Sequence, residues 1–459
     1  MKPPGSPRST PEITLVGAGL AGSLLAIFLG RRGYEVTLLE RRLDPRKESA
    51  GALGSAGRSI NLALANRGIA ALEEVGVMER IRPALISMAG RLLHDEKGRL
   101  KLVPYGNKPH EVIYSVSRAG LNALLLDAAE ATGKVAIRFG ETVQGVDFAT
   151  RRVRPQGTPY EVLIGTDGSA SAVRAAILER TKGRLDEEPL GHGYKELSIP
   201  AATGTAGVGS GRFRMEKNAL HIWPRGEYML IALPNVDGSF TVTLFLPNHG
   251  EESFEALKTP ESVRALFERR FADAIPLMPR LVEEFFGNPT GHLETIRCAP
   301  WSFEDQALVL GDAAHAIVPF HGQGMNAAFE DCGAFDRCLE NPDRTWNEIF
   351  AQFEKQRRPN TDAIADMALE NYVEMRSTVR EPKFQLKKDL SFRLEERHPD
   401  RFIPRYSMVM FHTIPYAEAK RRGAIQEEIL DELTVTAAKV DDVDLARADR
   451  LIVERLGTA

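Results

Sequence analysis

A glycine-rich turn near the N-terminus constrains the fold more than any other feature. Residues 12–40, EITLVGAGLAGSLLAIFLGRRGYEVTLLE, contain a short β-rich run, a G-A-G-L-A-G turn, a helix-length apolar segment and a second β-rich run. This order predicts a strand, a helix and a second, parallel strand. Because parallel strands need cover on both faces, we expect an open α/β domain around this unit.

The spacing of the glycines predicts a site for a dinucleotide. Gly17 allows a tight turn, Gly19 lets the backbone approach a pyrophosphate, and Gly22 lets helix and strand pack closely. The N-terminus of the helix supplies N–H donors to an anion. Glu40 ends the second strand, where a carboxylate can accept hydrogen bonds from both ribose hydroxyls. The alternative is a glycine-rich turn that serves packing only.

Two later strand ends bear on whether the dinucleotide is FAD or NAD. The run LIGTDGSASAVR ends in Asp167-Gly168 and is followed by Arg174, and the run ALVLGDAAH ends in Gly311-Asp312. A carboxylate at the carboxyl end of a parallel strand points into the ligand crevice of an open sheet. Asp312 could therefore bind the ribitol hydroxyls of FAD, which NAD lacks. Either aspartate alone could also be a turn residue or a helix N-cap.

The rest of the chain predicts a discontinuous α/β architecture, α+β overall. Short strands between about 190 and 250 suggest a mostly antiparallel sheet, and helical patterns occupy 61–82, 118–132, 260–287, 324–380, 382–398 and the chain from about 415. We expect three parts: a Rossmann-like cofactor domain (11–75, 100–180 and 290–380), a β-rich substrate domain (76–99 and 181–289), and a helical C-terminal region (381–459).

Composition excludes several classes of function. The formal net charge is −4, from 59 basic and 63 acidic residues, with no basic stripe for nucleic acid. Apolar stretches such as LLAIFL fall far short of the roughly 20 residues that span a bilayer, so no membrane anchor is expected. The 3 cysteines have no ligand-like spacing, which argues against a metal site and suits a reducing cytoplasm. The oligomeric state, monomer or homodimer, stays open.

Several motifs carry a resemblance to known flavoproteins. In this order, GAGLAG, DG and GDAAH resemble the flavoprotein monooxygenases of the para-hydroxybenzoate hydroxylase type, whose single dinucleotide fold holds FAD while NAD(P)H visits transiently. Longer stretches between residues 12 and 415 resemble the kynurenine 3-monooxygenase family: GRSINLALANRG, HGYKEL, NALHIWPRGEYMLIALPN, VPFHGQGMN, MALENYVEM and RFIPRYSMV. FAD binding does not require these longer stretches, so they are the more specific signal.

The resemblance implies a reaction. NADPH reduces FAD, the reduced flavin captures O2 as a C4a-hydroperoxide, and one oxygen atom passes to the aromatic ring of L-kynurenine to give 3-hydroxykynurenine. Such chemistry requires that water be kept away from the reactive oxygen. It also requires that the ring be held in a fixed orientation.

The resemblance also implies the site residues. For FAD it supports Gly17, Gly19, Gly22, Glu40, Arg41, Arg118, Asp312 and the backbone of Gly324, Met325 and Asn326. For the substrate carboxylate it implies a clamp of Arg91, Tyr105, Asn371 and Tyr406, with Phe240 lining the ring pocket. Pro319, Phe320 and His321 would form the edge that faces the chemistry. His321 would serve proton transfer or ring packing, and His315 would serve as a structural hydrogen-bonding group.

Three alternatives remain open from the sequence. The same chemistry could act on a modified kynurenine or another anthranilate-like aromatic acid. A flavin-dependent reductase or dehydrogenase could use the same fold. A flavin-binding sensor without catalysis is a third possibility, although a sensor has no evident use for a carboxylate clamp.

Overall fold

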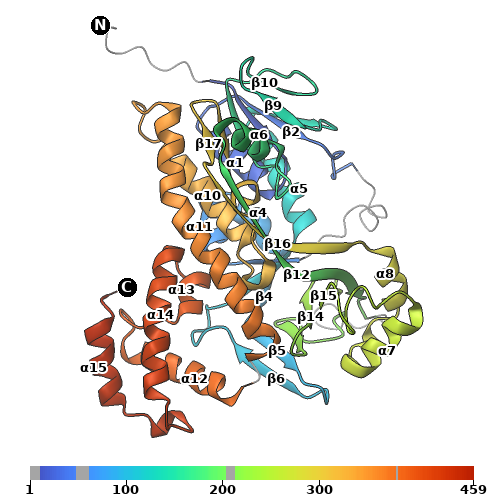
Figure 1. The fold of residues 1–459 in the computed structure, drawn as a ribbon, viewed down its shortest axis with the longest axis vertical. Coiled ribbons are helices and arrows are strands. Elements are labelled where there is room, and N and C mark those ends of the chain that lie inside the picture. The colour runs from blue at the N-terminus through green and yellow to red at the C-terminus, as the bar shows by residue number, and fades with distance from the viewer. Residues whose placement is uncertain (1–10, 48–60, 203–211, 379–380, 459) are drawn as a thin grey trace.

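The computed structural model describes residues 11–47, 61–202, 212–378 and 381–458. Figure 1 shows an elongated molecule whose three parts meet near its centre. The first part, at the top, is a sheet with flanking helices. A second sheet lies at the lower right, and the C-terminal helices gather at the lower left. The first motif of the family resemblance, residues 57–68, lies partly outside the described residues.

A six-stranded sheet confirms the predicted α/β unit. Its order is β17-β18-β11-β1-β2-β8, and every neighbouring pair is parallel except β17–β18. The strands are β1 (Ile13–Val16), β2 (Val36–Glu40), β8 (Val135–Phe139), β11 (Val162–Gly165), β17 (Ser302–Phe303) and β18 (Ala307–Val309). Two helices, α5 (Arg118–Glu130) and α10 (Gly324–Cys338), pack on α1 (Leu20–Arg31) beside the sheet. α6 (Ala172–Thr181) packs on β11 and β18.

The predicted helix over 61–82 is wrong at its start. Residues Asn61–Leu64 form β3, which pairs antiparallel with β7 (Ile113–Ser117); β4 (Ile86–Met88) joins the other side of β7. The helix proper is α3 (Asn66–Glu74), followed by the short α4 (Met78–Ile81). Tertiary pairing with β7 overrides the local preference, as it often does where a short apolar run satisfies both periodicities.

A seven-stranded sheet forms the second layer, in the order β16-β12-β15-β14-β13-β5-β6. Its strands are β5 (Gly90–His94), β6 (Leu100–Pro104), β12 (Arg184–Ile199), β13 (Leu220–Pro224), β14 (Met229–Pro234), β15 (Phe240–Pro247) and β16 (Thr290–Ala299). All neighbours are antiparallel except β13 and β5. α7 (Pro260–Arg270) and α8 (Leu281–Gly287) lie at its outer side, and their apolar residues share one core cluster with the sheet.

The predicted domain boundaries at 100 and 290 do not follow the sheets. β6 forms a hairpin with β5, and β16 runs beside β12, so both strands belong to the seven-stranded sheet rather than to the cofactor sheet. Sequence patterns locate strands but do not say which sheet a hairpin partner joins.

The helical part begins inside the cofactor region. The predicted run 324–380 divides into α10 and α11 (Trp346–Arg376), and Thr345 and Glu348 form a capping box at the start of α11. The remaining helices are α12 (Pro382–Arg397), α13 (Arg405–Met410), α14 (Tyr416–Leu433) and α15 (Leu445–Arg455). α11 contacts both α10 and α14, so it joins the C-terminal helices to the cofactor sheet (Figure 1).

Candidate active site

The glycine turn between β1 and α1 has the geometry that its sequence predicts. Gly17 has φ +100°, and a Cβ there would lie 2.6 Å from the Thr166 carbonyl oxygen. A Cβ on Gly22 would lie 2.0 Å from the Gly17 carbonyl oxygen, so helix and loop are in direct contact. Gly19, by contrast, faces open space and precedes α1 without a side-chain cap. The exposed N–H groups at this helix start are therefore free for an anion.

Glu40 lies where a ribose-binding carboxylate should lie. One of its oxygens accepts a hydrogen bond from the Ala18 N–H (2.9 Å), inside the glycine turn, and the other accepts from Arg42 (2.9 Å). Burial opposes ionisation of Glu40, but the hydrogen bonds from Arg42 and Ala18 hold its pKa below the usual value. Arg42 therefore pairs with Glu40. Arg41, predicted as a cofactor contact, is exposed beside this pair, and its role stays a prediction.

The two aspartates at the other strand ends have different roles. Asp167 supports the start of α6, because its carboxylate accepts hydrogen bonds from the N–H groups of Ala172 (2.8 Å) and Val173 (3.3 Å), next to the N-cap Ser171. Asp312 is exposed and lines the cavity described below, together with Arg118 at the start of α5. Asp312 therefore remains the candidate for the ribitol, whereas the Asp167 carboxylate supports the start of α6.

A second helix begins at the same cavity. α10 starts at Gly324 without a side-chain cap, and both Gly324 and Met325 line the cavity. The side chain of Asn326 points elsewhere: it donates to the carbonyls of Ala63 and Gly322 (both 2.8 Å) and accepts from the Ala65 N–H. Asn326 thus ties the turn before α10 to β3, so only its backbone is available to a cofactor.

His315 belongs to a buried charge network. Its Nε2 lies 2.6 Å from Asp331, whose other oxygen accepts from Arg357 Nε (2.6 Å) and which also accepts from the Gly311 N–H (3.2 Å). The charges of His315 and Arg357 outweigh burial and keep the pKa of Asp331 low. The network holds the strand end that carries Asp312, which is the structural role predicted for His315.

One cavity of about 370 Å³ runs from these cofactor-type groups to the seven-stranded sheet. At one end it is lined by Leu20, Arg118, Asp312, Gly322, Gly324 and Met325. At the other end it is lined by apolar side chains and the predicted clamp: Leu220, Ile231, Leu233, Phe245, Phe320, Met375, Arg91, Tyr105 and Tyr406. A single chamber thus joins both kinds of predicted site.

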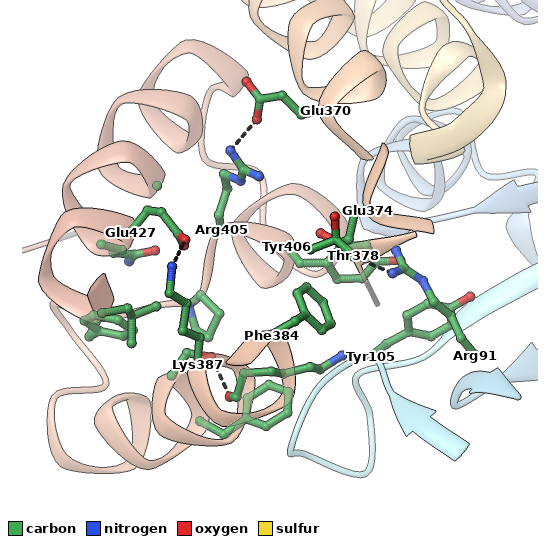
Figure 2. A pocket seen from close by; sticks show the side chains of 18 of the residues that line it. Arg91, Tyr105, Glu370, Glu374, Thr378, Phe384, Lys387, Arg405, Tyr406 and Glu427 are labelled. Atoms are coloured by element: carbon green, nitrogen blue, oxygen red, sulfur yellow. Dashed lines mark hydrogen bonds and ion pairs between the residues drawn. The ribbon is translucent and has the colours of Figure 1, made fainter. Parts of the chain in front are cut away.

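Three clamp residues meet at the wall of this cavity. The Tyr105 and Tyr406 rings are parallel, with centroids 5.5 Å apart, and the Arg91 guanidinium lies 5.9 and 5.2 Å from their centroids. Arg91 is 4% exposed, and its Nη1 donates to Glu374 (2.6 Å). Figure 2 shows this wall from a second cavity of about 320 Å³, on the side of the C-terminal helices.

Glu374 is a charged residue that the sequence reasoning missed. Burial opposes its ionisation, but Arg91 holds its pKa below the usual value; burial likewise opposes the charge on Arg91, whose pKa Glu374 raises. The pair is therefore ionised. The signal was available: Glu374 follows Asn371 by three residues, which places both on one face of α11.

Asn371 acts behind the clamp rather than on the cavity surface. Its Oδ1 accepts from Arg91 Nη2 (3.3 Å), and its Nδ2 donates to the Phe320 carbonyl (2.6 Å). It is 5% exposed and is not among the residues that line either cavity. Asn371 was expected to contact the substrate directly. In the structure it instead links Arg91 to the segment that carries Phe320.

The expectation that Phe240 lines the ring pocket is wrong. Phe240 is 0% exposed and packs in the cluster under α7 and α8, edge-on to His221. Phe245, on the same strand, lines the cavity and lies 5.0 Å from Phe320 between ring centroids. The reason is the two-residue period of a strand, which sends residues 240 and 245 to opposite faces.

Pro319, Phe320 and His321 form a single 3-10 turn that lines the cavity. His321 stacks on Tyr406 (centroids 5.4 Å apart), and its Nδ1 is buried with no hydrogen-bond partner among the described residues. Burial, with smaller contributions from Arg405 and Arg91, lowers the pKa of His321 to about 4. A neutral imidazole therefore faces the cavity. The buried Tyr105 hydroxyl likewise has no hydrogen-bond partner within the described ranges.

These residues fit FAD. Two helix starts without side-chain caps, α1 and α10, both reach the cavity, and Glu40 and Asp312 stand at the carboxyl ends of their strands. The donors suit a pyrophosphate and an electron-rich ring edge, and the carboxylates suit sugar hydroxyls. Within the described ranges, no group of three or more histidine, cysteine or acidic side chains is placed to hold a metal ion. No helix in those ranges combines the length and apolarity needed to span a bilayer.

Comparison with known proteins agrees with this geometry. Residues 10–368 match the family model described as FAD binding domain. Kynurenine 3-monooxygenase of Myxococcus xanthus (strain DK1622) is 49% identical over 454 residues, covering 97% of this chain and 95% of the relative. That of Stenotrophomonas maltophilia (strain K279a) is 46% identical over 453 residues, covering 97% of each chain.

Solved structures share the fold at low identity. 2-Methyl-3-hydroxypyridine-5-carboxylic acid oxygenase superposes with a TM-score of 0.63 at 19% identity, covering 82% of this chain and 95% of that one. PqsL of Pseudomonas aeruginosa superposes with a TM-score of 0.62 at 20% identity, covering 80% and 97%. With the identity to full-length relatives, these matches lead to one conclusion: the chain belongs to the kynurenine 3-monooxygenase family of proteins with an FAD-binding domain.

Proposed function

We propose that this chain is an FAD-dependent aromatic monooxygenase that converts L-kynurenine to 3-hydroxykynurenine with NADPH and O2. The observation that carries the proposal is the single cavity that joins the FAD-type cradle to the Arg91 clamp across an apolar middle. Kynurenine has a matching shape: an aromatic amine at one end and an amino-acid tail at the other. The names of the full-length relatives support the same substrate.

The clamp binds the tail. Arg91 offers a planar guanidinium that suits a carboxylate. The Tyr105 hydroxyl beside it has no hydrogen-bond partner among the described residues and can donate to the same group. Asn371 and Glu374 orient Arg91 from behind.

The apolar middle holds the ring and excludes water. Phe245 and Phe320 lie against each other on one side, with Leu220, Ile231, Leu233 and Met375 completing the lining. A substrate ring held in a fixed orientation reaches the reactive geometry at a lower entropic cost. A site without water also protects the reactive oxygen species from hydrolysis. The neutral His321 imidazole adds one hydrogen-bonding nitrogen without adding a charge.

The cradle holds the cofactor. Gly17, Gly19 and the start of α1 would receive the pyrophosphate, Glu40 the ribose and Asp312 the ribitol, with Arg118 and the start of α10 beside the ring system. The chemistry that FAD supplies when bound is the activation of O2 with electrons from NADPH, so that one oxygen atom enters the aromatic ring and the other becomes water.

Product identification tests the proposal. The FAD-loaded protein should convert L-kynurenine, NADPH and O2 to 3-hydroxykynurenine, seen by mass spectrometry, with close to one product per NADPH consumed. If a substituted kynurenine stimulates NADPH oxidation and L-kynurenine does not, the substrate is the substituted compound and the proposal is wrong on this point. Oxidation of NADPH without oxygen incorporation would indicate a reductase instead.

Location and assembly are part of the same proposal. The 3 cysteines are free and buried, as in a protein of the reducing cytoplasm. We place the enzyme there, as a monomer or homodimer; light scattering after size exclusion distinguishes the two states, and cell fractionation tests the location.

A further inference from the structure

One side chain inside the cofactor-facing turn points away from the cavity. Gly322 and Gly324 line the cavity, whereas Gln323 between them does not and is 0% exposed. Gln323 is also the residue directly before α10, whose uncapped start faces the cavity. The position of the Gln323 side chain therefore affects the backbone of Gly322 and Gly324, which would lie beside the cofactor ring.

The Gln323 amide is held by the C-terminal helices. The Tyr416 hydroxyl, at the start of α14, donates to Gln323 Oε1 (2.6 Å), and Gln323 Nε2 donates to the Met410 sulfur on α13 (3.0 Å). Tyr416 is 0% exposed, and burial raises the pKa of its hydroxyl, so it stays a donor. This bond joins residues 93 positions apart in the chain.

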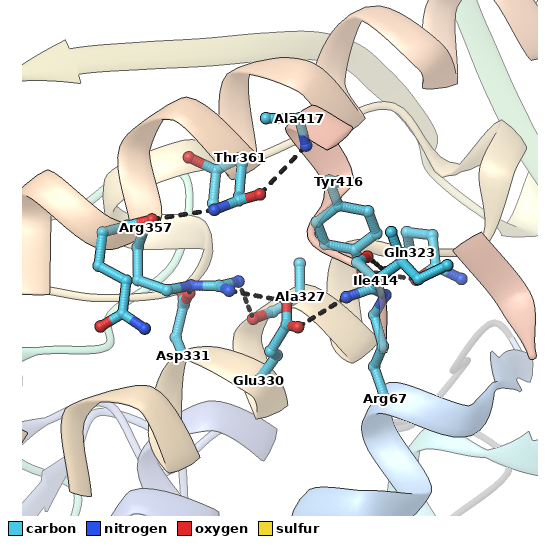
Figure 3. Close-up of polar contacts among 12 residues, drawn as sticks. Arg67, Gln323, Ala327, Glu330, Asp331, Arg357, Thr361, Ile414, Tyr416 and Ala417 are labelled. Atoms are coloured by element: carbon cyan, nitrogen blue, oxygen red, sulfur yellow. Dashed lines mark hydrogen bonds and ion pairs between the residues drawn. The ribbon is translucent and has the colours of Figure 1, made fainter. Parts of the chain in front are cut away.

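Tyr416 is itself held by the cofactor domain. The Arg67 guanidinium, from α3, lies 3.9 Å from the centroid of the Tyr416 ring. Arg67 donates to the carbonyls of Met408, Val409 and Ile414 and pairs with Glu330 on α10 (2.7 Å). Figure 3 shows Arg67, Glu330, Gln323 and Tyr416 as one continuous group. The Tyr416 ring is thus anchored by Arg67 on α3 as well as by its own hydrogen bond to Gln323.

The rest of the turn is fixed from other directions. Asn371 holds the Phe320 carbonyl, and Asn326 holds the Gly322 carbonyl. Gly322 has φ +67°, a conformation that costs a glycine little and therefore does not by itself stiffen the turn. Gln323 is a third attachment point, held by the Tyr416 hydroxyl and by the Met410 sulfur.

We propose that Tyr416 is a positioning residue for the flavin: through Gln323 it sets the backbone of the turn Pro319–Gly324 and the start of α10 against the cofactor ring. The inference rests on the proposed function, since it assumes that FAD occupies this cradle. It assigns to the C-terminal helices a role in cofactor geometry that is separate from their contribution to the clamp.

Tyr416→Phe tests this role by removing one oxygen atom. We expect FAD affinity, measured by quenching of flavin fluorescence on adding apoprotein, to fall about 3- to 10-fold, as for loss of one buried hydrogen bond. We also expect more hydrogen peroxide per NADPH, a shifted flavin absorption spectrum, and a KM for L-kynurenine within about twofold of the parent. The matched control is Tyr160→Phe, which removes a buried hydroxyl that has no partner among the described residues and does not line the cavity.

A double variant shows whether the effect passes through Gln323. If it does, Tyr416→Phe combined with Gln323→Met should be no worse than Gln323→Met alone. Additive losses, or a Tyr416→Phe variant with lowered melting temperature but unchanged FAD affinity, spectrum and coupling, would overturn the proposal. If Tyr416→Phe does not fold, Gln323→Met alone must still weaken FAD binding. The fluorescence titration needs no substrate, so a parent protein that binds FAD but does not hydroxylate kynurenine would contradict only the proposed function.

Discussion

Replacing Arg91 by methionine tests the clamp most directly. The substitution keeps an unbranched, partly apolar side chain but removes the buried guanidinium that lies beside the stacked rings of Tyr105 and Tyr406. A hydrogen bond to a charged group contributes about 1.5–3 kcal/mol, which corresponds to about 10- to 150-fold in the dissociation constant for L-kynurenine. We expect a loss in this range, with FAD affinity unchanged.

The structure also predicts that part of the lost affinity for L-kynurenine comes from leaving Glu374 unpaired. Without Arg91, the Glu374 carboxylate loses its partner at 2.6 Å and either repels the substrate carboxylate or takes up a proton. Adding Glu374→Gln to Arg91→Met should therefore recover part of the affinity. Arg405→Met is the matched control: Arg405 pairs with Glu370 (2.6 Å) in the second cavity, is 38% exposed, and does not line the cofactor cavity.

The assay is a titration of the FAD-loaded protein with L-kynurenine, followed by flavin absorbance without NADPH. Because no turnover occurs, the dissociation constant is separated from rate effects. A dissociation constant for Arg91→Met within threefold of the parent, or an equal loss in Arg405→Met, would refute the assignment of Arg91 to the carboxylate.

Three further predictions follow from single contacts. Phe245→Ala should weaken L-kynurenine binding at little cost to FAD, whereas Phe240→Ala should lower the melting temperature, at a cost of about 3–5 kcal/mol, and leave the dissociation constant unchanged. Asp331→Asn should destabilise the protein by about 3–5 kcal/mol and weaken FAD binding. Folding lowers the pKa of Asp331, so the ionised Asp331 should stabilise the folded parent protein above about pH 4 and lose this effect as pH falls through the folded pKa. Melting curves at several pH values test this dependence. His321→Gln should leave the shape of the kcat/KM profile between pH 5.5 and 8 unchanged, since a pKa of about 4 keeps the imidazole neutral there; a limb lost in the variant would contradict this.

The contacts of Asp167 and Asp312 show what the local sequence can and cannot predict. Both follow a buried strand with glycine beside them, so either could have faced the ligand. Only the position of α6 distinguishes their roles. The Asp167 carboxylate accepts hydrogen bonds from the first N–H groups of α6, whereas Asp312 lines the cavity. In the same way, the alternation of β15 is visible in the sequence, but which of its faces meets the cavity is not.

The clamp was recognisable only through the family resemblance. Arg91 lies on β5, Tyr105 follows β6, Asn371 and Glu374 lie on α11, and Tyr406 lies on α13. No spacing in the sequence connects these segments, because their contacts form when the C-terminal helices pack on the two sheets. For the same reason, the Tyr416–Gln323 bond and the direction of the Asn371 side chain could not have been predicted from the chain alone.

The sequence by itself determined the βαβ unit, the glycine turn, Glu40 at its strand end and the second glycine-rich turn before α10. Each of these depends on neighbours within about 30 residues, where backbone geometry and hydrogen bonding follow directly from residue type. Tertiary structure alone decided that Phe245 rather than Phe240 faces the cavity, that Tyr416 contacts Gln323, and that β6 and β16 complete the second sheet. Those outcomes depend on which surfaces meet, a result of packing the whole chain that no local pattern encodes.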